Sequence, residues 1–200
     1  MGLDINTEEG QKTLEDERRT IDIFRYNFPN LKYIETDKET SARCDGLIIK
    51  DNHAIAIVEQ KSRDMSLELF QTEYRERWLI TAEKVDRLID IANAMHVSLF
   101  GFLYLKRDDL LLAKTIFNIK TGELVKIERF ETETQATCNG GTARRLNAFI
   151  DMSGAKQYRA PHPKNFICRV CGAMAHYGFN VNYRADKGEW YCLEHKPHRS

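Results

Sequence analysis

The sequence predicts a mixed α/β domain whose central sheet is covered by helices on both faces, followed by a small C-terminal module that binds a metal. Three observations support this. Two apolar, β-branched runs flank a polar turn within residues 44–61, segments with helical periodicity precede and follow them, and cysteines with metal-ligand spacing occur near the C-terminus. The 200 residues are enough for one domain of ordinary size and a short appendage.

The central element is a predicted hairpin over residues 44–61, with its polar turn at Asp51-Asn52. Its second strand reads Ala-Ile-Ala-Ile-Val, which is apolar on both faces and predicts a buried central strand. The first strand opens on Asp45, and the second ends on Glu59-Gln60-Lys61. Charges at the end of a buried strand are costly unless something pairs them.

The length of the loop determines which side chains of this hairpin face each other. A two-residue loop would pair Asp45 with Val58 and turn Glu59 to the opposite face. A loop of three or five residues pairs Asp45 with Glu59 and places Lys61 on the same face. Because the Cβ atoms of opposed residues are about 5 Å apart, two carboxylates there favour a hard divalent cation such as magnesium. The ammonium of Lys61 can reach a metal-bound water or a phosphate oxygen.

An aspartate, thirteen residues and then Glu-x-Lys, at a strand pair flanked by helices, is a pattern that resembles the PD-(D/E)XK nuclease superfamily, with its restriction-endonuclease-like fold. The resemblance covers roughly residues 10–120. The proline of the superfamily name is absent, since Arg43-Cys44 precede Asp45. That position varies within the family.

The resemblance implies a deoxyribonuclease that depends on Mg²⁺ or Mn²⁺. Asp45, Glu59 and the main-chain carbonyl of Gln60 would hold the cation, which lowers the pKa of a bound water and neutralises charge on the scissile phosphate. Lys61 would orient or stabilise the attacking hydroxide. Family members often carry a further glutamate on the first helix, and Glu17 matches that position, with Glu15 and Asp22 as alternatives.

Helical spacing predicts a first helix over Thr13–Phe28 and a first strand over Leu31–Asp37. A second helix, capped by Ser66, has an apolar stripe formed by Leu67, Phe70, Tyr74 and Trp78. In the family this helix often meets the DNA backbone, which makes Gln71 and Arg75 weak candidates for nucleic-acid contacts. A solvated helix face is the alternative explanation.

The second half of the domain is predicted as one more helix and three strands. The helix runs from its cap at Thr81 to about Met95, and Lys84 and Arg87 lie off its apolar stripe. Three strands follow, at Val97–Leu105, Leu110–Ile119 and Glu123–Phe130. After them the sequence predicts a loop at Glu131–Gly141, a short helix at Arg144–Ile150 and a linker over residues 151–165. Gly101, inside a strand, indicates a bulge or close packing.

The C-terminal segment contains a CxxC knuckle, Cys168 to Cys171, and twenty residues later a CxxH pair, Cys192 and His195. Four such ligands place a closed, tetrahedral and therefore structural zinc site in this module, and His176 is a rival ligand with less suitable spacing. The segment resembles small C-terminal zinc ribbons of phage and bacterial proteins. A module of about thirty residues cannot build an adequate core, so the metal supplies most of its folding energy.

Charge is unevenly distributed although the formal net charge is zero. Residues 136–200 hold ten basic and four acidic side chains, a surplus that suits nucleic acid, and Arg169 and Arg184 are weak candidates for contacts. No apolar run is long enough to span a membrane, and the N-terminus has no signal-peptide pattern. Free cysteines with metal spacing fit a reducing compartment, so we expect an intracellular, cytoplasmic protein, phage-encoded or bacterial.

The leading hypothesis is a DNA endonuclease with a nuclease-like domain over residues 1–150, a linker over 151–165 and a zinc-ribbon module over 166–200. Junction-resolvase-like and restriction-type activities both remain open, as does homodimer formation. One alternative is a non-catalytic, zinc-containing nucleic-acid-binding protein on a nuclease-like scaffold. Another is a zinc-stabilised module that binds a protein partner.

Overall fold

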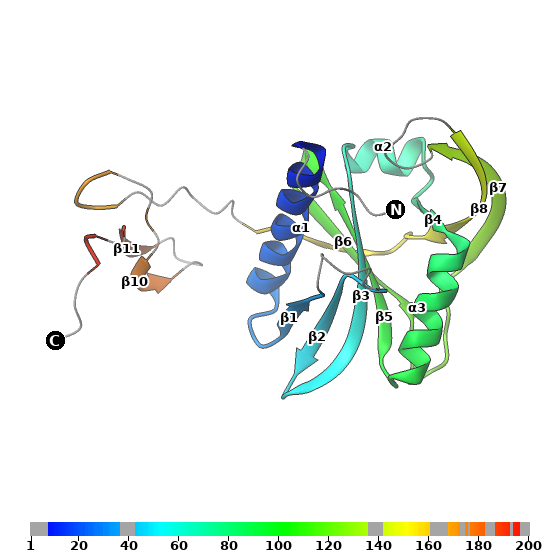
Figure 1. Ribbon diagram of the computed structural model, residues 1–200, viewed down its shortest axis with the longest axis horizontal. Helices are drawn as coiled ribbons and strands as arrows, with labels where there is room; N and C mark the ends of the chain where they lie inside the picture. Colours follow the sequence, from blue (N-terminus) through cyan, green and yellow to red (C-terminus); the bar gives the residue numbers. More distant parts are fainter. Residues whose placement is uncertain are drawn as a thin grey trace. The chain divides into compact units, whose positions relative to one another are not determined.

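The computed structural model describes residues 8–36, 43–135, 142–160, 168–172, 175, 177–182, 187–192 and 194–196. The chain divides into two compact units, Met1–Ala160 and Pro161–Ser200. Within the described residues, the first unit contains a six-stranded sheet, a three-stranded sheet and α-helices, and the second contains a two-stranded sheet (Figure 1).

The elements of the first unit are, in chain order, α1 (Glu8–Asn27), β1 (Lys32–Glu35), β2 (Gly46–Lys50), β3 (His53–Arg63), α2 (Leu67–Thr72), β4 (Arg77–Thr81), α3 (Ala82–Ala94), β5 (Ser98–Leu105), a 3-10 turn (Lys106–Asp108), β6 (Leu110–Phe117), β7 (Ile127–Gln135), β8 (Thr142–Asp151) and β9 (Lys156–Tyr158). The second unit contains β10 (Tyr177–Asn182) and β11 (Lys187–Tyr191), which pair antiparallel.

The large sheet has the strand order β1-β2-β3-β5-β6-β9. The β3–β5 pair is parallel and the other neighbours are antiparallel. Parallel neighbours need a long crossover, and here α2, β4 and α3 provide it. The predicted mixed α/β class with a mixed central sheet is therefore confirmed.

Helix α1 covers one face of the large sheet. Its buried residues Ile21 and Phe24 share a hydrophobic cluster with Ala56 and Val58 of β3 and with Phe102 of β5. The helix begins five residues earlier than the predicted Thr13, at Glu8.

The opposite face is covered by α2, α3 and the three-stranded sheet, whose order is β4-β8-β7. Val85 and Leu88 of α3 and Trp78 of β4 are buried there with Ile57 of β3. Gly101 of β5 makes this packing possible, because a Cβ at that position would lie 2.5 Å from Trp78 Cζ3. The predicted close packing at Gly101 is thus observed.

The predicted helix from Ser66 to Trp78 is wrong beyond its first turns. Ser66 is the N-cap as predicted, and its Oγ accepts a hydrogen bond from Leu69 N at 3.2 Å, but α2 ends at Thr72. Arg75 and Glu76 then adopt left-handed backbone angles, with φ of 51° and 55°, and turn the chain into β4. Trp78 is buried on a strand that pairs with β8.

The predicted short helix at Arg144–Ile150 is also wrong, because this segment belongs to β8. The predicted loop Glu131–Gly141 is a strand as far as Gln135, since β7 pairs with β8 from Ile127↔Ile150 to Gln135↔Thr142. Lys156–Tyr158, inside the predicted linker, instead forms β9 on the edge of the large sheet, next to β6.

Among the described helices, none is both long and apolar enough to cross a membrane.

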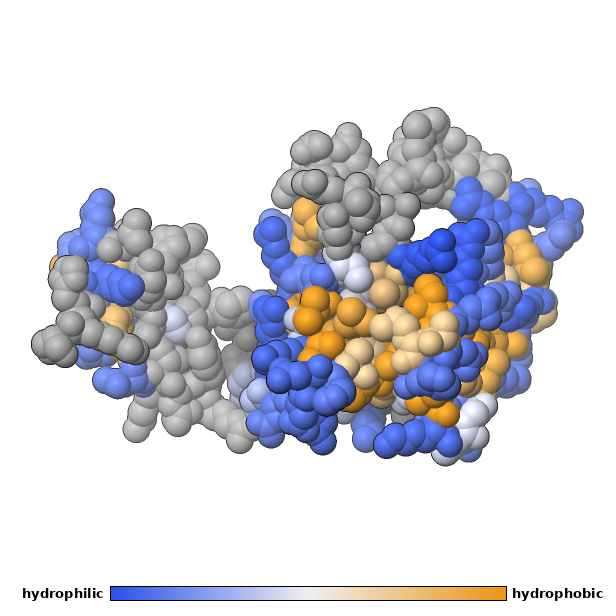
Figure 2. All heavy atoms as spheres, turned by 60° about the horizontal axis from the view of Figure 1, so that its bottom comes forward, coloured by the Kyte–Doolittle hydropathy of each residue, from blue (hydrophilic) through white to orange (hydrophobic). Residues whose placement is uncertain are grey.

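The surface of the first unit carries large hydrophobic side chains, among them Ile34, Ile55 and Met95. Figure 2 shows hydrophobic residues gathered on the face that it presents. Met95, at which the sequence predicts this helix to end, is the C-cap of α3 and is 44% exposed.

Candidate active site and metal centre

The hairpin formed by β2 and β3 sets the geometry of the candidate active site. Its loop has two residues, Asp51 and Asn52, with φ of 49° and 63°, and Lys50 pairs with His53 across it. Such left-handed pairs are typical of tight hairpin turns, and Asn and Asp adopt these angles readily. A loop of three or five residues is therefore not what closes the hairpin.

A β-bulge nevertheless restores the register that a three-residue loop would have given. Ile49 pairs with Ala54 and Ile48 with Ala56, so that Ile55 is an extra residue on β3. Beyond the bulge Gly46 pairs with Val58. Asp45 follows directly at the end of β2, where its N–H donates to Val58 O, and its charge lies close enough to Glu59 to act on that carboxyl group.

Glu59 is completely buried, and its carboxyl group lies close to other charges. Burial raises its pKa to about 8, and the nearby charge of Asp45 adds to the shift. Lys84 Nζ of α3 lies 2.5 Å from Glu59 Oε1 and opposes this shift. The contact is an ion pair with Oε1, and Oε2 has no hydrogen-bond partner among the described residues. This oxygen can therefore accept a further ligand.

Asp45 is held at the end of the strand pair by the main chain. Its Oδ2 accepts a hydrogen bond from Gln60 N at 2.8 Å, and its own N–H donates to Val58 O at 2.9 Å. The next residue is Gly46, and the phenol ring of Tyr33 occupies the space that a Cβ atom at residue 46 would fill. Asp45 is half-buried.

Lys61 and Gln60 follow Glu59 on alternate faces of β3. Lys61 shares the face of Glu59, its side chain is exposed, and its charge lowers the pKa of Glu59, though less than Lys84 does. The side chain of Gln60 points to the α1 face, where it is buried and where both its amide atoms lack a hydrogen-bond partner among the described residues. Asp45, Glu59 and Lys61 are thus brought together.

Glu17 approaches the candidate site from the other face of the sheet. It lies on α1, and its charge and that of Asp45 both raise the pKa of Tyr33, after the larger effect of burial. Glu17 and Asp45 therefore both lie near the Tyr33 phenol. Of the alternatives to Glu17, Glu15 is exposed. The pKa of Asp22 is raised overall, because burial outweighs the opposing charges of Arg25 and Arg19.

The predicted nucleic-acid contacts are spread over both units. Gln71 is exposed on α2, and Arg75 is exposed in the turn after it. Arg169 forms an ion pair with Glu189 of β11. Arg184 lies outside the described residues.

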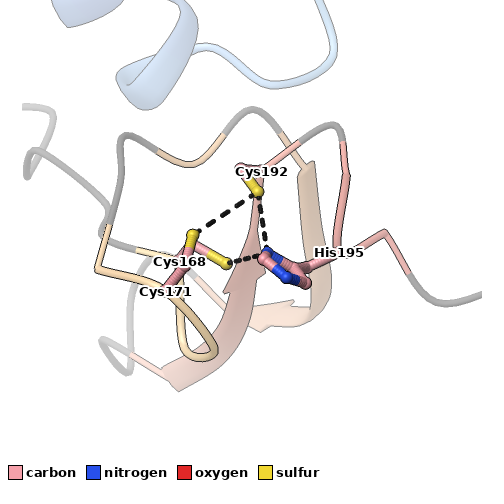
Figure 3. Close-up of side chains that lie close together, drawn as sticks. All are labelled: Cys168, Cys171, Cys192 and His195. Carbon is pink, nitrogen blue, oxygen red and sulfur yellow. Dashed lines mark hydrogen bonds between the residues drawn. The ribbon is translucent and has the colours of Figure 1, made fainter.

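The second unit brings Cys168, Cys171, Cys192 and His195 together (Figure 3). Their ligand atoms all lie within 4.8 Å of one another. Cys171 Sγ is 3.7 Å from Cys192 Sγ, and His195 Nδ1 is 3.1 Å from Cys192 Sγ and 3.7 Å from Cys168 Sγ. Three sulfurs and one ring nitrogen at such distances could bind a zinc ion tetrahedrally. The rival ligand His176 lies outside the described residues.

The main chain of the knuckle supports these ligands. Gly172 has φ of 73°, in the left-handed region, and its N–H donates to Cys168 O at 2.9 Å, closing the tight turn that the sequence predicted. The pKa of the Cys168 thiol is lowered to about 6: burial opposes this shift, and hydrogen bonds from the main chain of Cys192 and Cys171 outweigh burial. A thiolate is the form that binds metal.

Comparison with known proteins gives a structural neighbour of low sequence identity. No family model and no curated protein matches the chain. A solved structure of Hjc from Archaeoglobus fulgidus, a Holliday junction resolvase from an archaeal hyperthermophile, is similar at 15% identity with a TM-score of 0.39. The match covers 68% of this chain and 88% of that chain.

Lys84 is the residue of the candidate site that sequence patterns missed. Its position off the apolar stripe of α3 suggested a solvated side chain, yet it reaches the buried carboxylate of Glu59. One signal in the sequence could have indicated Lys84. The carboxylate of a buried glutamate needs a positive partner, and Lys84 is a basic residue in the first turns of the helix that covers the face of Glu59.

Proposed function

We propose that this chain is a Mg²⁺- or Mn²⁺-dependent deoxyribonuclease of the PD-(D/E)XK type that hydrolyses phosphodiester bonds of DNA. The observation that carries the proposal is the buried carboxylate of Glu59 close to the charge of Asp45, with Lys61 next along the same face. Such a pair is costly to bury and common at catalytic sites.

The residues present suit a hard divalent cation. Asp45 and Glu59 offer carboxylate oxygens, and Glu59 Oε2 has no hydrogen-bond partner among the described residues. The main chain of Gln60 lies at the site, since its N–H binds Asp45, and its carbonyl is a proposed ligand. The cation would supply an acidified water and neutralise charge on the phosphate.

Lys61, Glu17 and Tyr33 have further roles in the proposed site. Lys61, with an exposed ammonium on the face of Glu59, orients the attacking hydroxide or stabilises charge on the phosphate. Glu17 completes the site from the α1 side. The nearby Tyr33 has a raised pKa, so it stays a neutral phenol there.

In the second unit, the three cysteines and His195 hold a structural zinc ion. The basic surplus of residues 136–200 binds the DNA backbone, with Arg169 and Arg184 among the contacts and Gln71 and Arg75 as further contacts in the first unit. Junction-resolvase-like and restriction-type selectivity are the two substrate preferences proposed, with homodimer formation suiting both.

A digestion assay tests this function. Wild type, Asp45→Asn and Lys61→Ala are incubated with branched, linear and nicked DNA in Mg²⁺, Mn²⁺ or chelator. We expect cation-dependent cleavage by the wild type and none by either variant, with DNA binding retained in gel-shift assays. Asp51→Asn is the matched control, because it makes the same chemical change in the turn of the same hairpin, where asparagine tolerates a left-handed φ. Undiminished cleavage by Asp45→Asn would contradict the proposal.

A second candidate is a nucleic-acid-binding protein without catalysis. The Lys84–Glu59 ion pair favours it, because that pair neutralises the carboxylate without a metal ion. The same assay separates the two functions: binding of DNA by the wild type without cation-dependent cleavage would support this second candidate.

A further inference from the structure

Lys84 reaches the acidic pair from the helix that covers it. Its Nζ lies 2.5 Å from Glu59 Oε1, and the side chain of Glu59 is fully buried whereas that of Lys84 is 35% exposed. Burial lowers the pKa of Lys84, but the charges of Glu59 and, more weakly, of Asp45 outweigh it and raise this pKa overall. Among the described residues, this ammonium is therefore the counter-charge in direct contact with Glu59, and Lys61 has a smaller effect.

A divalent cation and this ammonium would compete for the same oxygen. A cation bound between Asp45 and Glu59 takes Oε1 or Oε2 as a ligand, and a positive ammonium 2.5 Å from Oε1 repels it. Lys84 can withdraw, because its side chain is long, flexible and already partly in solvent. Glu59 is fixed within a central strand and cannot withdraw.

We propose that Lys84 is a positioning residue that acts as the internal counter-ion of the Asp45–Glu59 pair and is displaced when a divalent cation binds. Lys84 thereby sets the cation concentration at which the site fills. This inference rests on the proposed function, since it assumes that the pair binds such a cation.

Chemical labelling of lysines tests the displacement in the wild-type protein without DNA. The protein is acetylated with an N-hydroxysuccinimide ester, in chelator and in Mg²⁺, and the modification of each lysine is followed by mass spectrometry. We expect Lys84 to react slowly in chelator, and about fivefold faster or more in Mg²⁺. Lys50, exposed at the turn of the β2–β3 hairpin, is the control and reacts equally in both. An unchanged or slower reaction of Lys84 in Mg²⁺ would overturn the inference.

Binding measurements on two variants give the second test. Lys84→Met removes the competing charge, and Arg87→Met removes a like charge from the same helix at a side chain that is 67% exposed and pairs with Glu83. Calorimetric titration with Mg²⁺ is run at about pH 8.5, where protons compete less for the carboxyl group. We expect Lys84→Met to bind Mg²⁺ about five- to 150-fold more tightly than the wild type, and Arg87→Met to match the wild type.

The outcomes separate the inference from the function on which it rests. Absence of Mg²⁺ binding by the wild type would overturn the proposed function. Binding by the wild type, together with equal or weaker binding by Lys84→Met, would overturn the counter-ion role and leave the proposed function standing.

Discussion

The phenol ring of Tyr33 lies against Gly46, in the space that a Cβ atom at residue 46 would occupy. Tyr33 belongs to β1 and packs edge-on against Phe24 of α1, so the ring is fixed from its other side. Because Gly46 directly follows Asp45, this contact links the packing of β1 to the position of a proposed metal ligand.

Gly46→Ala is therefore expected to destabilise the protein by about 1–3 kcal/mol, as overpacking of a core does, and to weaken Mg²⁺ binding. The added methyl group must push away either the ring or the start of β2. Urea unfolding and calorimetric titration measure the two effects. Tyr33→Leu removes the colliding atoms, so the double variant should recover part of the loss. A Gly46→Ala protein as stable as the wild type would refute this account.

The buried Glu59 predicts a specific pH dependence in the absence of divalent cations. Its pKa is raised from 4.5 to about 8, so the folded state binds this proton more tightly than the unfolded chain does. The resulting stabilisation is complete below about pH 4.5 and is lost as the pH rises through about 8. Glu59→Gln should remove this dependence and be more stable than the wild type near pH 9, by up to about 5 kcal/mol.

Urea unfolding in chelator at several pH values measures that difference. Glu83→Gln, at an exposed side chain in the first turn of α3, is the control and should follow the wild type. If the wild type instead gained stability relative to Glu59→Gln as the pH rose from neutral to alkaline, the pH dependence would have the opposite sign. That result would contradict the burial of this carboxyl group.

Arg19 predicts a stability effect far from the candidate active site. Its Nε donates to Asp109 Oδ1 at 2.8 Å and its Nη2 donates to Ala160 O at 2.7 Å, which links α1 to the β5–β6 turn and to the end of the first unit. Arg19→Met should lower the free energy of unfolding by about 3 kcal/mol, because Asp109 loses a partly buried partner. The adjacent Arg18 is exposed, and Arg18→Met should change stability by about 0.5 kcal/mol or less. Thermal and urea unfolding of both variants provide the comparison.

Removal of zinc is expected to affect the second unit alone. The chain has two tryptophans, Trp78 buried in the core of the first unit and Trp190 in β11, so fluorescence of single-tryptophan variants reports on each unit separately. A strong chelator should change the emission of Trp190 and leave that of Trp78 unaltered, since the metal provides most of the folding energy of a small module. Cys171→Ser should produce the same change without chelator. A parallel loss of the Trp78 signal would show that the units unfold together.

Local patterns in the sequence were sufficient for the hairpin and for the cysteine cluster. Alternation and β-branched residues identify β2 and β3 because each strand pairs with its neighbour along the chain, and a two-residue turn connects them. The four residues of the proposed zinc site are recognised by spacing alone, since the knuckle is a local turn closed by Gly172.

Pairing between distant segments explains what the patterns missed. Leu67, Phe70, Tyr74 and Trp78 have helical spacing, yet Trp78 is on β4, whose partner β8 lies far along the chain. Leu146, Ala148 and Ile150 alternate as a strand does, but β8 pairs with β4, which lies far along the chain. Lys84 was missed for a related reason, because its partner Glu59 is on a different element.

The bulge at Ile55 has a consequence for relatives of this protein. Deleting Ile55 would leave the pairs on either side of it intact, from Lys50↔His53 through to Gly46↔Val58, and Asp45 would still lie close to Glu59. Two acids separated by twelve residues can therefore build the same site as two separated by thirteen. A search for homologues that allows only one spacing would discard proteins that differ merely by a single-residue indel in this hairpin.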